Sequence, residues 1–192
     1  MSELTNTSTT VETQAAAERA RPRWGRIIAW SSLIGLLIIV GFGLYMAQQG
    51  PVSIGNRAPN FTMTTFEGDK ITLESLRGKV VVINFWASWC KPCEEEAADL
   101  EAAWRYYQPR GDVVFLGIDY VDTEREAKAY LQKFDITYPN GPDLGTRISH
   151  RFRILGVPET YIIDQDGILV NKKISPYRNL NEIKGMIDPL LD

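Results

Sequence analysis

The sequence of 192 residues has few of the side chains that most often hold metals: two cysteines and one histidine. A structural zinc site takes four ligands, and His150 is the one further strong candidate beside the cysteines, so such a site is disfavoured. The formal net charge is only −3, and no Lys/Arg stripe of the kind that binds nucleic acid is present in the body of the chain. We therefore expect neither a metal nor a nucleic acid as a ligand.

What is present is ordinary for a globular protein, with 44% hydrophobic and 23% charged residues. One long uncharged run stands out, from Ile27 to Ala47. As a helix, these 21 residues would be about 31 Å long, close to the hydrocarbon thickness of a bilayer. A cleavable signal peptide is the alternative, but its apolar core is normally about 7 to 15 residues long. The run is longer, and "YMAQQG" is a poor cleavage site, so the sequence favours an uncleaved anchor.

The orientation of this anchor follows from the distribution of positive charge around it. Arg19, Arg21, Arg23 and Arg26 precede the run, whereas the next basic residue after it is Arg57. The positive-inside rule then places the N-terminus in the cytoplasm and everything after the span outside, in the periplasm or at the outer face of the cell membrane.

The chain is accordingly divided into four parts. Residues 1–26, which begin with a polar, Thr-rich stretch, are predicted to form a disordered cytoplasmic tail. Residues 27–47 are the transmembrane anchor and residues 48–58 a linker that spans at most about 40 Å. Residues 59–192 are predicted to form the globular domain.

Two stretches of this domain, "VVVINFW" (80–86) and "VVFLGI" (113–118), are almost continuously apolar, as expected of strands buried on both faces of a parallel sheet. A connecting helix is predicted by apolar residues that recur at spacings of four and three: Cys93, Ala97, Leu100, Trp104 and Tyr107. Before this βαβ unit, "FTMTTFEGDKITL" predicts a short hairpin. After it, the pattern predicts a helix from about Thr123, a hairpin of "TYIID" and "ILVNKKI", and a C-terminal helix. His150 is taken as a helix residue without a functional role.

Both cysteines lie in "WCKPC", at the point where the first buried strand gives way to the helix. The N-terminus of a helix favours an anion, so Cys90 is predicted to be the more acidic thiol and to attack disulfides as a thiolate. Cys93, one turn further and on the apolar face, is predicted to be shielded and to resolve the mixed disulfide. Covalent haem attachment would need His after the second cysteine, where Glu94 stands. A purely structural disulfide remains possible, but so short a loop stabilises little.

The segments "VVVINFWASWCKPC" and "GVPET" resemble the thioredoxin superfamily, and in particular its membrane-anchored TlpA, ResA and CcmG (DsbE) types. The resemblance covers residues 53–192. It implies an α/β thioredoxin fold, with a central mixed sheet flanked by helices and an extra N-terminal β-hairpin. It also implies a thiol-disulfide oxidoreductase that uses no cofactor beyond its two thiols.

The resemblance further implies that Pro158 follows a cis peptide bond and that Val157 offers its backbone to an extended substrate. Glu159 after this proline is similar to the CcmG type; it is assigned to substrate contact and is also a second candidate for moving the proton, with a solvated carboxylate as the alternative. Trp89 is predicted to contact the substrate protein. A buried aspartate of thioredoxin is replaced by Asn84, which cannot titrate.

Helix geometry selects another proton carrier among the three glutamates that follow Cys93. Of these, Glu96 returns to within about 60° of Cys93 around the helix axis. Its partial burial is predicted to raise its pKa towards neutrality and to let it act as an acid or base. Glu94 and Glu95 are interpreted as carboxylates of the first turn that the helix dipole favours.

The resemblance implies reduction of client disulfides, with apocytochrome c as the favoured client during cytochrome c maturation. The electrons would come from a membrane donor of the CcdA or DsbD kind. The alternatives are a disulfide oxidase, a reductant for copper-site assembly proteins, and a module that binds a client or haem without turnover. A peroxidase is disfavoured, because peroxiredoxins keep a threonine three residues before the reactive cysteine, where this chain has Ala87.

Overall fold

The structure is a computed structural model that describes residues 24–48 and 52–191, in two compact units. The first unit is the helix α2 (Trp24–Gln48), in which Ile27–Leu44 is long and apolar enough to cross a membrane. The predicted anchor is thus a single continuous helix. Residues 24–26 are the start of α2 and not part of a disordered tail, so the prediction is wrong for them. The rest of the predicted tail, with Arg19, Arg21 and Arg23, lies outside the described residues, as do residues 49–51 of the predicted linker.

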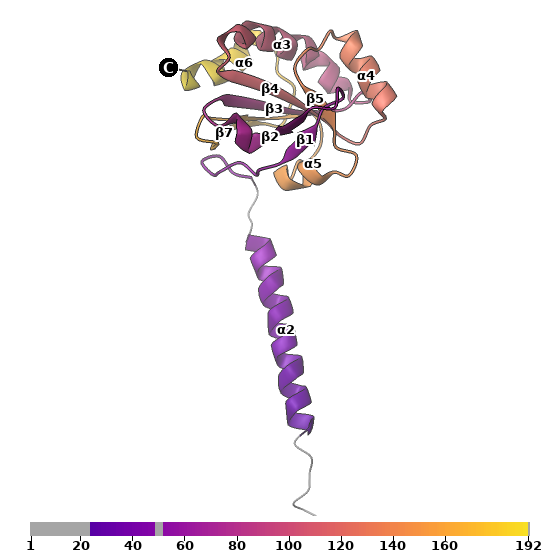
Figure 1. Cartoon of the computed structure of the whole chain (residues 1–192), viewed down its shortest axis with the longest axis vertical. Helices are drawn as coiled ribbons and strands as arrows, with labels where there is room; N and C mark the ends of the chain where they lie inside the picture. Colours follow the sequence, from indigo (N-terminus) through magenta and orange to yellow (C-terminus); the bar gives the residue numbers. More distant parts are fainter. Residues whose placement is uncertain (1–23, 49–51, 192) are drawn as a thin grey trace, which may run out of the picture. The chain divides into compact units, whose positions relative to one another are not determined.

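The second unit is built on a five-stranded mixed sheet in the order β5-β4-β3-β6-β7, beside a two-stranded sheet of β1 and β2. Figure 1 shows α3 and α6 on one face of the large sheet, and α5 with the β1–β2 hairpin on the other. The strands are β1 (Thr62–Thr64), β2 (Lys70–Thr72), β3 (Val80–Trp86), β4 (Val113–Asp119), β5 (Asn140–Pro142), β6 (Glu159–Ile163) and β7 (Leu169–Lys173). The α-helices are α3 (Lys91–Tyr107), α4 (Glu124–Lys133), α5 (Arg147–Phe152) and α6 (Leu180–Ile187), with 3-10 turns η1 (Leu73–Leu76), η2 (Gln108–Arg110) and η3 (Asp188–Leu190).

The predicted βαβ unit is confirmed as β3, α3 and β4, with β3 and β4 parallel and in register from Val80 beside Val113 to Trp86 beside Asp119. All seven residues of β3 are buried, because helices cover one face and α5 with the N-terminal hairpin covers the other. β6 joins the other edge of β3 antiparallel, and β7 follows it. Both predicted hairpins and the thioredoxin architecture are therefore present.

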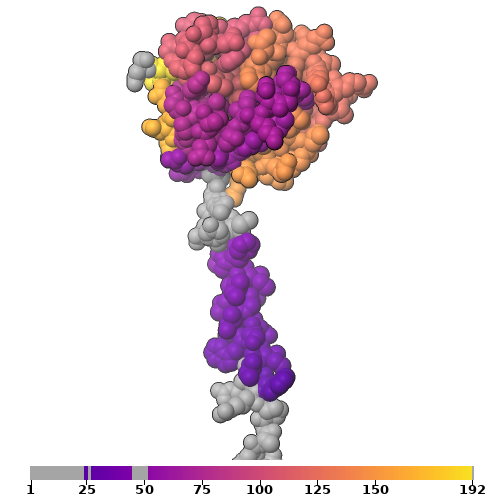
Figure 2. Space-filling model, viewed as in Figure 1, coloured from indigo at the N-terminus to yellow at the C-terminus, as the bar shows by residue number. Residues whose placement is uncertain are grey.

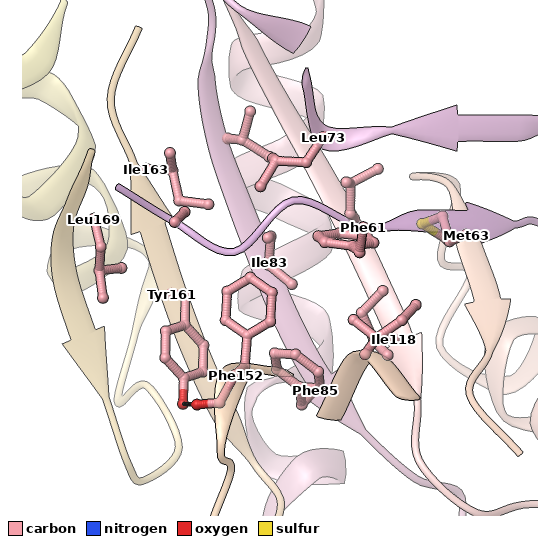
Figure 3. Packing of buried hydrophobic residues seen from close by; sticks show 14 residues of the cluster. Phe61, Met63, Leu73, Ile83, Phe85, Ile118, Phe152, Tyr161, Ile163 and Leu169 are labelled. Atoms are coloured by element: carbon pink, nitrogen blue, oxygen red, sulfur yellow. Dashed lines mark hydrogen bonds between the residues drawn. The ribbon is translucent and has the colours of Figure 1, made fainter. Parts of the chain in front are cut away.

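The two faces of the sheet bury different cores. Figure 3 shows the core on the α5 side, where Phe85, Phe152 and Tyr161 pack edge to face or tilted, with ring centroids 5.0 to 5.6 Å apart. The Tyr161 hydroxyl donates to the Phe152 carbonyl, which fixes the C-terminal end of α5 against β6. The other face carries the α3 and α6 side chains, among them Leu100, Tyr107 and Ile183.

The strand β5 has no counterpart among the predicted elements. It is only three residues long and consists of Asn140, Gly141 and Pro142, so it shows neither alternation nor β-branched residues. Its position depends on tertiary contacts, because it pairs with the end of β4 and lies under the β1–β2 hairpin. Figure 2 shows that hairpin, in purple, on the surface beside the orange residues near 140–150.

The predicted start of the globular domain at residue 59 is wrong. Gly55 and Asn56 exchange backbone hydrogen bonds with Leu169, at 2.8 and 2.9 Å, and the Ala58 N–H donates to Gly167. Residues 55–58 therefore belong to the domain, as an added segment along the start of β7. The tether between the two units is shorter than the predicted linker of residues 48–58.

A buried tryptophan is held in place from the neighbouring strands. The Trp86 indole N–H donates to Asn140 Oδ1 at 2.8 Å, and the Asn140 amide donates to the Tyr138 carbonyl. Gly117 lies on β4 between them, where a Cβ atom would stand 1.6 Å from Asn140 Oδ1 and 2.9 Å from Trp86 Nε1. Both neighbours are buried, so neither has space to move away.

We therefore expect Gly117→Ala to lower the free energy of unfolding by about 2 kcal/mol, the usual effect of overpacking a core. Thermal unfolding of the full chain in detergent measures it. The matched control is Gly185→Ala in α6, where a Cβ would meet nothing within 4 Å. This change should stabilise the helix by about 0.5 to 1 kcal/mol. Equal effects of the two substitutions would contradict the packing described for Gly117.

Candidate active site

The two cysteines form a disulfide at the N-terminus of α3, with their Cα atoms 5.3 Å apart. Cys90 is the N-cap residue, and its Sγ accepts a hydrogen bond from the Cys93 N–H at 3.1 Å. Pro92 in the first turn suits a position whose N–H would have no partner within the helix. When the disulfide is reduced, the same N–H group and the helix dipole stabilise a thiolate on Cys90.

The pair is largely enclosed, with exposed fractions of 3% for Cys90 and 1% for Cys93. Both pack in one cluster with Trp86, Ala97 and Tyr130. The Tyr130 hydroxyl, from α4, donates to the Cys93 carbonyl at 2.8 Å, and its ring stacks on Trp86 at 4.5 Å between centroids. The first turn of α3 is thereby connected to β5 through Tyr130, Trp86 and the Trp86 bond to Asn140.

The loop after β4 supports the residues that precede Cys90. The Asp122 carboxylate accepts from the Ser88 N–H at 2.7 Å and from the Thr123 N–H at 2.8 Å. Val121 has φ 48°, a left-handed conformation that β-branched residues rarely adopt, and its carbonyl accepts from the Trp89 indole at 3.3 Å. Trp89 nevertheless remains 59% exposed, so most of its ring is free to contact another protein.

Glu96 lies one helical turn beyond Cys93 in α3, with only 1% of its surface exposed. One carboxylate oxygen accepts from the Asn84 amide at 2.8 Å and the other from the Tyr177 N–H at 2.9 Å. Burial raises the pKa of Glu96 to about 7, against the opposing effect of these two hydrogen bonds. The predicted burial and raised pKa of Glu96 are thus confirmed, and Asn84 serves as its hydrogen-bond donor.

The peptide bond between Val157 and Pro158 is cis, as predicted. Val157 packs against the cluster that contains the cysteines. Within the part of the chain that the structure describes, its backbone N–H and C=O take no hydrogen bond. They are therefore available to a strand added from outside.

Glu159 has a different environment from the solvated carboxylate considered as an alternative, because it is completely buried. Its carboxylate accepts from the Leu155 N–H at 2.6 Å, the Gly156 N–H at 3.3 Å and the Tyr161 hydroxyl at 2.7 Å. Lys172 Nζ lies 3.4 Å away. Glu159 shares the sheet face of Tyr161, opposite the face of Thr160, which binds Asn84. It is thus separated by the sheet from Glu96.

The structure therefore brings Cys90, Cys93 and Glu96 together, places Val157 beside them, and leaves Trp89 at the surface. Lys91, which lies between the two cysteines in the sequence, is exposed and binds Glu94 at 2.7 Å. Residues that the motif alone does not reveal complete the site. These are Tyr130 and Asn140, which position α3 and Trp86, and Asp122, which holds the Ser88 N–H. The position of Asp122 just before a helix N-cap is the one sequence signal for them.

A mixed sheet of this order, with a CxxC pair at the N-terminus of the helix after its central strand, is the arrangement of thioredoxin-fold thiol-disulfide oxidoreductases, and this chain is one of them. It belongs to the AhpC/TSA family, whose model matches residues 54–172. Among curated proteins, it is 38% identical over 148 residues to the thiol-disulfide oxidoreductase ResA of Bacillus cereus, covering 74% of this chain and 85% of that protein.

Solved structures agree with this assignment. A putative protein disulfide isomerase of Bacteroides thetaiotaomicron is 33% identical, with a TM-score of 0.67, covering 73% of this chain and 91% of the other. A putative thiol:disulfide interchange protein DsbE of Chlorobium tepidum has a TM-score of 0.68 over 73% of this chain and 99% of the other. Its identity is 20%, so it is similar in fold alone.

The buried Glu96 predicts a pH dependence of stability. Because its pKa is raised from 4.5 in the unfolded chain to about 7 in the folded one, the folded state binds more protons between these values. The free energy of unfolding should therefore fall as pH rises from 4.5 to 7, by about 3 kcal/mol from this group, and then level off. Denaturant titrations of the oxidised chain at several pH values, compared with Glu96→Gln, isolate the contribution. The same pH slope in both proteins would contradict the assignment.

The contacts of Glu159 predict that it shapes the loop before the cis-proline. Glu159→Ala removes the acceptor of two loop N–H groups and the partner of Lys172, so KM for a disulfide-containing peptide should rise about tenfold, a change of about 1.4 kcal/mol. Reaction with a small disulfide, which needs no strand addition, should keep its rate. Glu159→Gln retains one acceptor oxygen and should restore most of the peptide KM. Equal losses with both substrates would exclude a loop-specific role.

Proposed function

We propose that the protein is an extracytoplasmic, membrane-anchored reductase of client disulfides, with apocytochrome c as its principal client. The observation that carries the proposal is the Cys90–Cys93 pair at the start of α3, with a buried carboxyl one turn beyond Cys93 and a cis-proline loop beside it. Each group matches one need of disulfide exchange: a thiolate, a proton carrier and a backbone edge that aligns the client.

In the proposed reaction, the Cys90 thiolate attacks one sulfur of the client disulfide. The S–S bond of the client breaks, a mixed disulfide forms, and the other client cysteine leaves as a thiolate. Cys93 then gives its proton to the Glu96 carboxylate and attacks Cys90 Sγ. This step restores the disulfide seen here and releases the second client thiolate. Two electrons pass from the pair to the client, and Glu96 returns its proton to solvent or to the leaving thiolate.

The client binds, in this proposal, along Val157, with Trp89 and Pro158 as flanking contacts. The exposed indole of Trp89 and the unpaired backbone of Val157 support this placement. Glu159 acts from the opposite face of the sheet by holding the N–H groups of Leu155 and Gly156, so it positions the loop without touching the client.

The compartment is part of the same proposal. The four arginines before the apolar stretch that starts at Ile27 favour a cytoplasmic N-terminus, which would place the domain after the anchor on the outer side of the membrane. Cytosolic thiol pools do not reach that side, so a membrane dithiol donor of the CcdA or DsbD kind would reduce the Cys90–Cys93 disulfide after each turnover. Apocytochrome c is a suitable client because its two haem-binding cysteines must be thiols before haem attaches.

The decisive experiment is trapping with Cys93→Ser in the full chain expressed in a cytochrome c-producing host. Without the resolving thiol, the mixed disulfide on Cys90 should accumulate and carry apocytochrome c, as identified by mass spectrometry. The double variant with serine at both positions is the matched control and should capture nothing. A Cys93→Ser adduct that holds only other clients would contradict the cytochrome role, and no adduct at all would contradict the mechanism. A reduction potential as oxidising as that of DsbA would contradict the direction of transfer.

A further inference from the structure

A second buried carboxyl group lies near the disulfide and has no part in the mechanism above. Asp119, the last residue of β4, has an exposed fraction of 0%. Neither of its carboxylate oxygens has a hydrogen-bond partner among the described residues. Buried polar groups in folded proteins are almost always paired, so an unpaired carboxyl group requires an explanation. No hydrogen bond offsets the free-energy cost of burying this carboxyl group, which argues against a purely structural role.

The position of Asp119 is fixed by the register of the sheet. It lies directly beside Trp86 on β3, and parallel neighbours in register direct their side chains to the same face. That face carries Trp86 in the cluster with Cys90, Cys93 and Tyr130. Asp119 therefore borders this group of residues, the redox cluster, at the C-terminal ends of β3 and β4, where α3 begins.

The charges around Asp119 oppose its ionisation. Burial raises the pKa of Asp119 to about 7, and the negative charge of Asp122 in the next loop makes a smaller contribution in the same direction. The other buried titratable groups on this face are Tyr130 of α4 and, at the start of α3, the two cysteines and Glu96. None of these is a cation, because the basic side chains of α4 and of the first turn of α3 (Lys91, Arg125, Lys128 and Lys133) are exposed. A thiolate on Cys90 would thus add a second negative charge to a poorly hydrated cluster.

We propose that Asp119 is a second proton acceptor of the redox centre, which takes up a proton when the Cys90–Cys93 disulfide is reduced and releases it when the disulfide forms again. A donor dithiol supplies two electrons and two protons. The S–S bond of Cys90 and Cys93 breaks while that of the donor forms. One proton goes to the Cys93 sulfur and the other to the Asp119 carboxylate, and Cys90 becomes a thiolate.

This exchange keeps the charge of the cluster constant. Before reduction, the negative charge is on Asp119, and after reduction it is on Cys90. Like charges in a poorly solvated site disfavour each other strongly, whereas moving one charge between two sites avoids that repulsion. Glu96 differs, because two N–H donors stabilise its carboxylate and because it lies beside Cys93 along α3. The inference rests on disulfide exchange by the cysteine pair, and not on the identity of the client.

The test is reduced-minus-oxidised infrared difference spectroscopy on the full chain in detergent, with dithiothreitol as the donor. Reduction should produce a band of a protonated carboxyl group that is lost in Asp119→Asn. The matched control Asp112→Asn changes a surface carboxylate just before β4, which binds Arg110, and should keep the band. Glu96→Gln should also keep the contribution of Asp119 to this carboxyl band. In Asp119→Asn, reduction at pH 7 should take up fewer protons for each disulfide than in the unmodified chain, because the carboxylate that accepts the second proton is missing.

A measurement on the unmodified chain covers the case in which Asp119→Asn fails to fold. Carbon-13 NMR of labelled aspartate carboxyl groups should show a higher pKa for Asp119 in the reduced than in the oxidised chain. Equal values in the two states, or an infrared band that persists in a folded Asp119→Asn protein, would overturn the proposal. If disulfide exchange is normal in the same samples, such a result would remove the role of Asp119 and leave the oxidoreductase function intact.

Discussion

The short connection between β3 and α3 is the constraint on which the rest of the site depends. β3 ends at Trp86 and α3 begins at Lys91, so the few residues between them must turn the chain and place Cys90 as the N-cap. The disulfide then lies where the C-terminal end of a buried strand meets the unpaired N–H groups of a helix. Everything that stabilises this connection also positions the reacting sulfur atoms. Tyr130 binds the first turn of α3, Asn140 holds Trp86, and Asp122 binds the N–H of Ser88.

The central sheet separates two tasks that a chain could otherwise combine at one place. On the α3 face, Asn84 and the Tyr177 N–H stabilise the Glu96 carboxylate next to the redox pair. On the α5 face, Glu159 binds the loop that leads to the cis-proline, and its charge is balanced by Lys172. A negative charge is therefore available for the loop without being added to the redox cluster. This division explains how two buried glutamates serve one site without repelling each other across it.

Much of this arrangement could be predicted from the sequence, since buried parallel strands, an amphipathic helix and a CxxC pair leave strong local patterns. The cis bond before Pro158 and the burial of Glu96 were accessible in different ways: the first through the resemblance, the second through helix geometry. Asn140 was not accessible, because β5 is a strand only through its pairing with β4. The buried contacts of Glu159 could not be predicted either, because its partners lie in a preceding loop and on β7. Residues 55–58 have a polar composition typical of a linker, and only their hydrogen bonds to the start of β7 show that they belong to the domain.

The buried acids also show how the site relates to the stability of the fold. A carboxyl group whose pKa is raised by burial destabilises the folded protein at any pH above its ordinary value. Glu96 and Asp119 both titrate near pH 7, so each reduces the stability of the domain in neutral solution. Apolar residues of similar size would fit the same core without this loss. What apolar residues do not provide is a group that exchanges protons at neutral pH beside a disulfide. The large apolar cores on both faces of the sheet supply the stability that permits two such groups.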